Sequence, residues 1–115
     1  MPGGDAADSE QSAPQVLEQL VERAERAGAS DIHLHMRAGL ASVAFRLDGV
    51  MTPTADLTAD IAERVFGRIK FLARLKTYQE SLPQDGRIDK ADLGAHTDIR
   101  VTTYPSVTGE KIVLR

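Results

Sequence analysis

The residue types best suited to chemistry in this sequence are three arginines toward its C-terminal end. Arg87, Arg100 and Arg115 fall on three successive segments that alternate between apolar and polar residues, as β-strands do. A guanidinium group is permanently charged and presents paired planar donors that match phosphate oxygens, so several on rigid strands could engage a phosphate chain. The alternative is surface ion pairing with neighbouring carboxylates, which contributes little stability, and spacing alone favours that alternative. The alternation also predicts that Arg100 and Arg115 point away from the apolar side chains of their strands.

Two histidines form a second candidate group, because His33 and His35 project from the same face of a predicted strand. Together with His96 or Asp31 they have the donor atoms of a metal site. The sequence contains no cysteine and no H-E-x-x-H motif, and polar residues are usual on the solvated face of a sheet. We therefore interpret these histidines as surface residues and expect no metal.

Motifs for other chemistry are missing from the sequence. It has no G-x-x-x-x-G-K-[ST], because Gly109-Glu110-Lys111 lacks the spacing and the following hydroxyl, and it has no G-x-G-x-x-G or G-x-S-x-G. Ser30, His33 and Asp98 are the residue types of a hydrolase triad, but nothing in the pattern provides a nucleophile elbow or an oxyanion hole. We expect that this chain alone is not an enzyme and binds no nucleotide in the P-loop manner.

Length, charge and hydropathy favour a single domain that neither binds nucleic acid nor crosses a membrane. The 115 residues, 42% of them hydrophobic, suffice for one domain with a single core. The formal net charge of −3 provides no general cationic field, so nucleic acid is not an expected partner. No apolar run approaches the roughly 18 residues of a membrane helix, and the first residues lack the regions of a signal peptide. We expect a cytoplasmic protein without direct membrane insertion.

The first half of the sequence predicts one helix followed by three strands. Residues 1–11 are small, polar and acidic and are predicted to be a tail or linker. Ser12 and Gln15 have the spacing of a capping box for a helix that ends near Gly28. Alternation predicts strands at 31–36 and 42–47, and Asp48-Gly49 predicts a two-residue hairpin turn. A short third strand at 50–52 is expected to end before Pro53.

The second half repeats this order. A helix is predicted to begin near Asp56 or Thr58 and to reach about residue 74, followed by a loop or short helix at 76–87. Strands are predicted at 87–89, 97–104 and 110–115, separated by turns at 91–94 and 105–109. The order αβββαβββ predicts an α+β domain with two helices packed on a mainly antiparallel sheet of about six strands. The last strand pattern has no turn or polar tail after it, so we expect the coding sequence to continue.

Six sequence blocks in register resemble a known family. They are ASDIHL at 29–34, FRLDGV at 45–50, RIK at 68–70, LPQDGRI at 82–88, DIRV at 98–101 and GEKIVLR at 109–115. Over about residues 15–115 the chain resembles the N-terminal, PAS-like domain of the type II secretion and type IV pilus assembly ATPases. The resemblance identifies 12–115 as that domain, with the RecA-like ATPase domain absent from this chain.

The resemblance implies a nucleotide site shared between two domains. In that family the PAS-like domain precedes the RecA-like domain, which holds the Walker motifs, and arginines of the former reach the nucleotide phosphates. Arg100 and Arg115 match best by motif, Arg87 is a good third, and Arg46 is a fourth. ATP and Mg²⁺ are the implied cofactors of the full-length protein, and none is expected for this chain alone.

The implied setting is a homo-hexamer on the cytoplasmic side of the inner membrane, in contact with membrane platform proteins of a secretion or pilus system. The leading hypothesis is thus a non-catalytic regulatory and coupling domain of such an ATPase. A stand-alone PAS-like module that binds a small ligand or a protein is the alternative. A Walker A lysine in the sequence after Arg115 would favour the first. A third hypothesis, a metal-dependent enzyme that uses the histidines, requires a bound metal, and we expect none.

Overall fold

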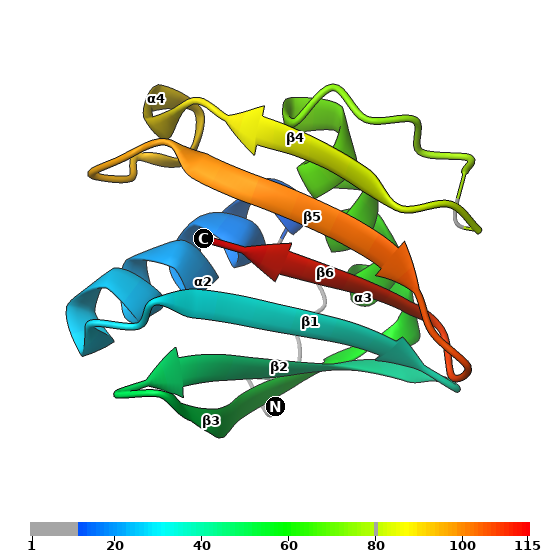
Figure 1. The fold of residues 1–115 in the computed structure, drawn as a ribbon, viewed down its shortest axis with the longest axis horizontal. Coiled ribbons are helices and arrows are strands. Elements are labelled where there is room, and N and C mark those ends of the chain that lie inside the picture. The colour runs from blue at the N-terminus through cyan, green and yellow to red at the C-terminus, as the bar shows by residue number, and fades with distance from the viewer. Residues whose placement is uncertain (1–11, 80) are drawn as a thin grey trace, which may run out of the picture.

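A computed structural model describes residues 12–79 and 81–115 of the chain, so the tail predicted at 1–11 lies outside the described residues. The elements in order are α2 (Ala13–Ala27), β1 (Asp31–Arg37), β2 (Leu40–Leu47), β3 (Val50–Thr58), α3 (Ala59–Leu72), β4 (Gln84–Ile88), α4 (Lys90–Leu93), β5 (Ile99–Pro105) and β6 (Glu110–Leu114) (Figure 1). The strands form one antiparallel sheet in the order β3-β2-β1-β6-β5-β4. The predicted α+β fold and its six-stranded sheet are confirmed, and α4 adds a single helical turn where a turn was predicted.

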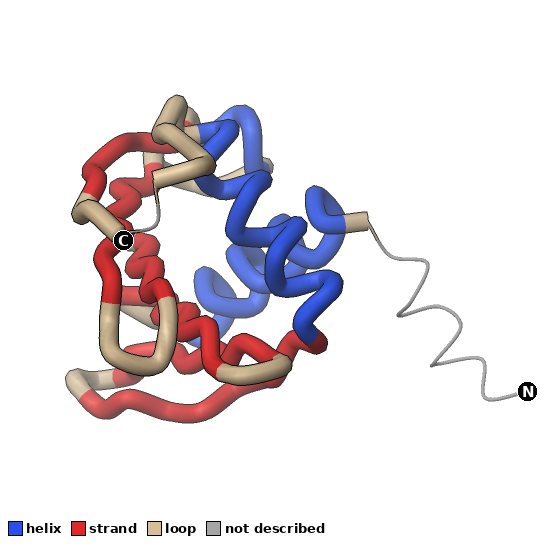
Figure 2. The backbone as a smooth tube through the Cα atoms, turned by 90° about the vertical axis from the view of Figure 1, so that its right-hand side faces the viewer, coloured by secondary structure: helices blue, strands red, loops and turns tan. Residues whose placement is uncertain are grey.

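The helices pack together on one face of the curved sheet, as Figure 2 shows. The core lies between these two layers and is built from the apolar stripes of α2 and α3 and the inward residues of the strands. Its largest fully buried apolar side chains are Leu17, Leu34, Val43, Val65, Ile69, Ile88, Val101 and Ile112. No described helix covers the opposite side of the sheet, which we call the outer face.

The start and end of α2 agree with the prediction. The Ser12 hydroxyl accepts a hydrogen bond from the Gln15 backbone N–H at 3.3 Å, and the Gln15 side chain accepts one from the Ser12 N–H at 3.1 Å. Gly28 ends the helix in the left-handed conformation, with φ of 73°. Local chemistry alone therefore sets both boundaries of this helix.

The predicted end of the third strand before Pro53 is wrong, because β3 continues to Thr58. β3 is an edge strand, where proline is tolerated because one side of the strand has no ladder to donate to. The register shifts between Val43, which pairs with Ala55, and Ala44, which pairs with Pro53, so a bulge absorbs one extra residue. The following helix begins at Ala59, with Thr58 as its N-cap residue.

The strand predicted at 87–89 begins earlier, at Gln84, and so includes Asp85 and Gly86, which were predicted to lie in a loop. Gly86 pairs with Val101 on β5 and passes close to the end of α3. A Cβ atom at this position would lie 2.7 Å from the Ala73 carbonyl oxygen. The glycine is therefore needed for close backbone approach between strand and helix rather than for a turn.

Candidate functional site

The four arginines singled out from the sequence lie in one line across the outer face. Arg46 on β2 is paired with Asp31 on β1, and the antiparallel register of β1 and β6 continues from Asp31 to Arg115. Arg115 and Arg100 exchange backbone hydrogen bonds of 2.8 and 2.9 Å, and Arg100 is paired with Arg87 on β4. We call Arg46, Arg115, Arg100 and Arg87 the arginine row; Asp31 stands between its first two members.

The alternation of the strands puts the row on the outer face, as predicted for Arg100 and Arg115. The residues next to the row and to Asp31 along each strand point into the core instead; they are Phe45, Ile32, Leu114, Val101 and Ile88. The side chains of Arg87 and Arg115 are 72% and 68% exposed, whereas that of Arg46 is 35% exposed. The row thus presents permanent positive charge at one end of the sheet, where β2 and β4 end and β1 and β5 begin (Figure 1).

Asp31 binds two members of the row at once. Its Oδ2 accepts a hydrogen bond from Arg46 Nε at 3.1 Å, and its Oδ1 lies 3.2 Å from Arg115 Nε. Although Asp31 is on the outer face, its side chain is only 8% exposed. A carboxylate this buried needs charged partners, and the two guanidinium groups supply them.

Of the remaining two arginines, one has a long contact and the other has no side-chain partner in the described part of the chain. Arg87 Nε lies 3.9 Å from Asp98 Oδ2, and the other oxygen of that carboxylate accepts a hydrogen bond from the Lys90 N–H at 2.9 Å. Within residues 12–79 and 81–115, the Arg100 side chain has no ion pair or hydrogen bond. Like charges directly opposite each other in a sheet are destabilising. Arg87, Arg100 and Arg115 nevertheless occupy adjacent strands in register, which costs stability.

The three histidines lie in different surroundings. His33 Nε2 is 3.5 Å from Asp31 Oδ2, beside the arginine row. His35 Nε2 hydrogen-bonds with Thr108 Oγ1 at 2.6 Å and with Ser106 Oγ at 3.1 Å. His96 Nδ1 lies 3.3 Å from a carboxylate oxygen of α2. Among the described residues, no group of three or more His, Asp or Glu side chains is placed to hold a metal.

The residue types of the hydrolase triad are also separated. β6 lies between β1, which carries His33, and β5, which Asp98 precedes. The Asp98 carboxylate is engaged at the start of α4 and near Arg87. These positions do not form the nucleophile and base arrangement of a hydrolase.

His35 sits in a positively charged part of the outer face. Burial, and then the charges of Lys111 and Arg37, lower the pKa of His35 from its ordinary value. Ser106 Oγ also donates to the Gly109 carbonyl at 2.6 Å, so these hydrogen bonds tie the turn between β5 and β6 to β1.

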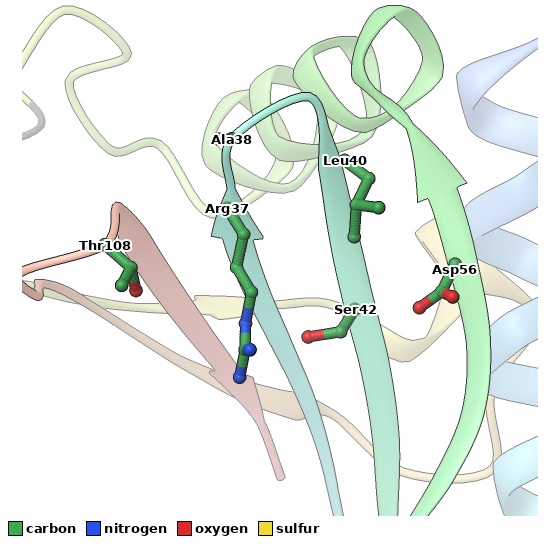
Figure 3. Close-up of a pocket in the computed structure, with 6 residues that line it drawn as sticks. All are labelled: Arg37, Ala38, Leu40, Ser42, Asp56 and Thr108. Carbon is green, nitrogen blue, oxygen red and sulfur yellow. The ribbon is translucent and has the colours of Figure 1, made fainter.

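A shallow groove of about 580 Å³ lies next to this turn. Its lining residues are Arg37, Ala38, Leu40, Ser42, Asp56 and Thr108 (Figure 3). Figure 3 shows the Arg37 side chain extending between Thr108 on one side and Ser42 on the other, with Asp56 beyond on β3. The surface of the groove is more apolar than polar, Arg37 and Asp56 place one charge of each sign in it, and it lies apart from the arginine row.

Sequence reasoning identified the arginines but missed the role of Asp31, which it weighed only as a metal ligand. Its pairing with Arg46 follows from the short turn between β1 and β2, so the hairpin pattern contains a signal for it. Its contact with Arg115 depends on the pairing of β1 with β6, for which the sequence has no local signal.

No helix in the described part of the chain is long and apolar enough to cross a membrane.

Comparison with known proteins gives a consistent set of relatives. Residues 6–115 match the family described as Type II/IV secretion system protein. Protein transport protein HofB homolog of Haemophilus influenzae is 43% identical over 101 residues, covering 87% of this chain and 22% of the relative. Type II secretion system protein E of Pseudomonas aeruginosa is 39% identical over 113 residues, covering 96% and 22%. Type IV pilus assembly ATPase TfpB of Acinetobacter baylyi is 36% identical over 108 residues, covering 93% and 18%.

The chain spans about a fifth of the length of these curated relatives. Among solved structures it resembles the pilus retraction motor PilT with bound ADP, with a TM-score of 0.57 and 21% identity. That match covers 86% of this chain and 28% of the PilT chain. At this identity the likeness shows a shared fold.

Proposed function

The chain belongs to the Type II/IV secretion system protein family, and from that premise we propose that it is a non-catalytic coupling domain of a secretion or pilus assembly ATPase. In this role it presents arginines to the phosphates of ATP held by a following RecA-like domain. Arg87, Arg100 and Arg115 are the main contacts, and Arg46 is a fourth. The chain by itself does not hydrolyse ATP.

The observation that carries this proposal is the register of three like charges on neighbouring strands. Adjacent strands are about 4.8 Å apart, so the outer members of the Arg87, Arg100 and Arg115 set are separated by roughly 10 Å. Arg100 has no side-chain partner among the described residues, and Arg87 has only a long contact with Asp98. A polyanion bound across these strands would remove the repulsion between them.

The chain fits one half of a nucleotide site and not the whole. Its row matches the charge of a phosphate chain, but its sequence has no glycine-rich loop to cradle phosphates and no P-loop lysine. The P-loop and the Mg²⁺ ligands therefore belong to the partner domain in this proposal. ATP supplies the phosphoryl bond whose hydrolysis drives the cycle.

The arginines act through charge and distance. Guanidinium groups next to the phosphates offset the negative charge that develops during phosphoryl transfer. Loss of the terminal phosphate weakens their attraction and releases this domain from the RecA-like domain, so the two rotate apart. The stiff antiparallel sheet transmits this movement because three members of the row lie on its strands and the backbone of Arg115, directly after β6, is hydrogen-bonded to that of Arg100.

The proposed assembly follows the same reasoning. The working unit is a homo-hexamer on the cytoplasmic side of the inner membrane, where rotation between domains moves a secretion or pilus platform. Partners are the RecA-like domain, neighbouring subunits and the platform proteins, with no role for nucleic acid or membrane insertion.

ATP turnover in the complete polypeptide that carries this domain tests the proposal. Arg100→Ala and Arg115→Ala should each lower turnover by about tenfold or more, because each removes a cation from the transferring phosphates. Arg64→Ala is the matched control: Arg64 lies in the helical layer, paired with Asp60 at 3.0 Å, away from the row. It should leave turnover unchanged.

Wild-type turnover in both row variants, with the fold intact by circular dichroism, would overturn the proposal. Equal losses in all three variants would also contradict it, since they would point to a general defect. Reading the gene beyond codon 115 provides an independent check, because the proposal requires a Walker A motif in the protein that contains this domain.

The groove beside Thr108 favours a second candidate function, a PAS-like module that binds a small ligand. Its lining combines mostly apolar surface with the polar groups of Arg37, Asp56 and Ser42, which suits a small molecule that has an apolar body and zwitterionic or hydroxylated groups. Calorimetric screening of such compounds against the chain and its Arg37→Ala variant tests this candidate. Binding that depends on Arg37 would support it, and the absence of binding would reject it.

A further inference from the structure

We infer that Asp31 is a positioning residue for the arginine row: its carboxylate holds Arg46 and Arg115 by their Nε atoms and leaves their outer donors for a phosphate ligand. The inference rests on the proposed function and deepens it. Asp31 would set the positions of two of the four guanidinium groups of the row.

The geometry gives Asp31 one oxygen for each arginine. Oδ2 contacts Arg46 Nε at 3.1 Å and Oδ1 contacts Arg115 Nε at 3.2 Å. A guanidinium has five N–H donors in a planar fork, and the Nε–H is only one of them. In Arg46 one terminal nitrogen also donates to the Gly49 carbonyl at 3.1 Å. The Arg115 side chain is 68% exposed, so it remains accessible to a ligand while it contacts Asp31.

Burial makes this contact more than an exposed ion pair. The Asp31 side chain is 8% exposed, so its carboxylate is shielded from water that would compete for the two arginines. Exposed ion pairs stabilise little, because solvent and salt screen the attraction and ordering the two side chains costs entropy. Here a single buried anchor restricts two long side chains at once, and a ligand that binds them afterwards loses less conformational entropy.

This role predicts the opposite sign from simple charge counting. Asp31 is negative and lies inside a cationic row, so charge counting predicts that its removal strengthens binding of an anion. Positioning predicts that removal weakens binding, because asparagine replaces one of the two carboxylate oxygens with an NH2 donor, so one of the two arginines loses its contact. Asp31→Asn keeps the size of the side chain and separates the two explanations.

The experiment titrates the chain with inorganic tripolyphosphate and follows the arginine Nε–H signals by NMR. Asp31→Asn should weaken tripolyphosphate binding by about fivefold, the cost of ordering one released arginine. The matched control is Asp98→Asn, which removes the same charge beside Arg87 but leaves Arg46 and Arg115 held. It should leave binding unchanged or strengthen it. Tighter binding in Asp31→Asn would overturn the inference.

A measurement on the unmodified chain keeps the inference testable if Asp31→Asn fails to fold. The Nε–H protons of Arg46 and Arg115 should exchange with water more slowly than that of Arg100, which has no side-chain partner among the described residues. If Asp31 only stabilised the fold without contacting these arginines, the three Nε–H exchange rates would not differ in this way. Equal exchange at all three positions would overturn the inference.

The outcomes distinguish this inference from the proposed function. Slow exchange at Arg46 and Arg115, combined with wild-type ATP turnover of Arg100→Ala and Arg115→Ala in the complete polypeptide, would contradict the proposed function and support the anchoring by Asp31. Loss of ATP turnover in Arg100→Ala, combined with tighter tripolyphosphate binding in Asp31→Asn, would support the proposed function and overturn the positioning role.

Discussion

Arg100 and Arg115 lie directly opposite each other, and each backbone N–H donates to the carbonyl of the other, at 2.8 and 2.9 Å. In an antiparallel ladder such a pair has Cα atoms about 5.5 Å apart and side chains on the same face. Two permanently charged side chains therefore project side by side from the outer face, and Arg87 adds a third positive charge on the next strand. This arrangement favours an anionic partner at the expense of stability.

Replacing Arg100 with threonine should stabilise the isolated chain. Arg100→Thr removes repulsion from both neighbours and introduces a residue suited to strands, so we expect a gain of about 0.2 to 1 kcal/mol in the free energy of unfolding. Urea denaturation measures it. The gain should shrink in high salt, which screens charge; a loss of stability in low salt would contradict the prediction.

A buried ion pair joins α3 to β6. Lys70 Nζ lies 2.7 Å from Glu110 Oε2, and the two side chains are 3% and 6% exposed. Lys70→Met or Glu110→Leu alone should cost about 3 to 5 kcal/mol, because each removes one member of a buried pair of opposite charges. The double variant Lys70→Met with Glu110→Leu should recover most of that loss. Chemical denaturation of all three variants measures their free energies of unfolding. If the loss in the double variant equals the sum of the two single losses, the two residues do not stabilise each other.

Gly109 should not tolerate a side chain. It has φ of 149°, and an added Cβ would collide with the Met36 carbonyl oxygen of the adjacent strand. Gly109→Ala should lower the free energy of unfolding by about 1 to 3 kcal/mol through backbone strain, with the added cost of moving β1. Thermal unfolding gives the comparison with wild type, and an unchanged melting temperature would show that the turn adapts.

Gly67 is the matched opposite case. It lies inside α3, its φ is negative, and nothing lies within 4 Å of the position a Cβ would take. Gly67→Ala should stabilise the chain by about 1 kcal/mol, because alanine loses less backbone entropy in a helix than glycine. The same thermal assay applies. Destabilisation here would mean that the helix face is in closer contact than the structure shows.

Stability should rise with pH near neutrality because of His35. Burial and the charges of Lys111 and Arg37 hold the pKa of His35 below its ordinary value of 6.5. As pH falls through 6.5 the unfolded chain binds a proton that the folded chain does not, so folding loses free energy. Well above pH 6.5 His35 is neutral in both the folded and the unfolded chain, so it no longer makes the free energy of unfolding depend on pH.

Proton NMR of the His35 ring gives the folded pKa directly, and His35→Gln provides the control by removing this part of the pH dependence. A His35 pKa above 6.5 would contradict the prediction. The NMR signals of Ser106 and Thr108 should shift over the same pH range, since both hydroxyls hydrogen-bond to the ring.

Local patterns in the sequence predicted much of the fold. The capping box at Ser12, the stop at Gly28 and the alternation that places Arg100 and Arg115 on the outer face all depend on residues within a few positions of one another. The exceptions are also physical. β3 passes through Pro53 because it is an edge strand, and β4 begins before Gly86 because β5 pairs with it. Neither edge position nor strand pairing is visible in a local window.

The sequence by itself determined which residues carry permanent positive charge and toward which side of each strand they point, since alternation is a property of the backbone. Only the tertiary structure decided that they form a single row with Asp31 inside it. That result depends on β1 pairing with β6, the contact that joins the two halves of the sheet. Pairing between segments so far apart in the sequence is selected by burial of the shared core, where a shift of one residue would turn Asp31 inward and Ile32 outward.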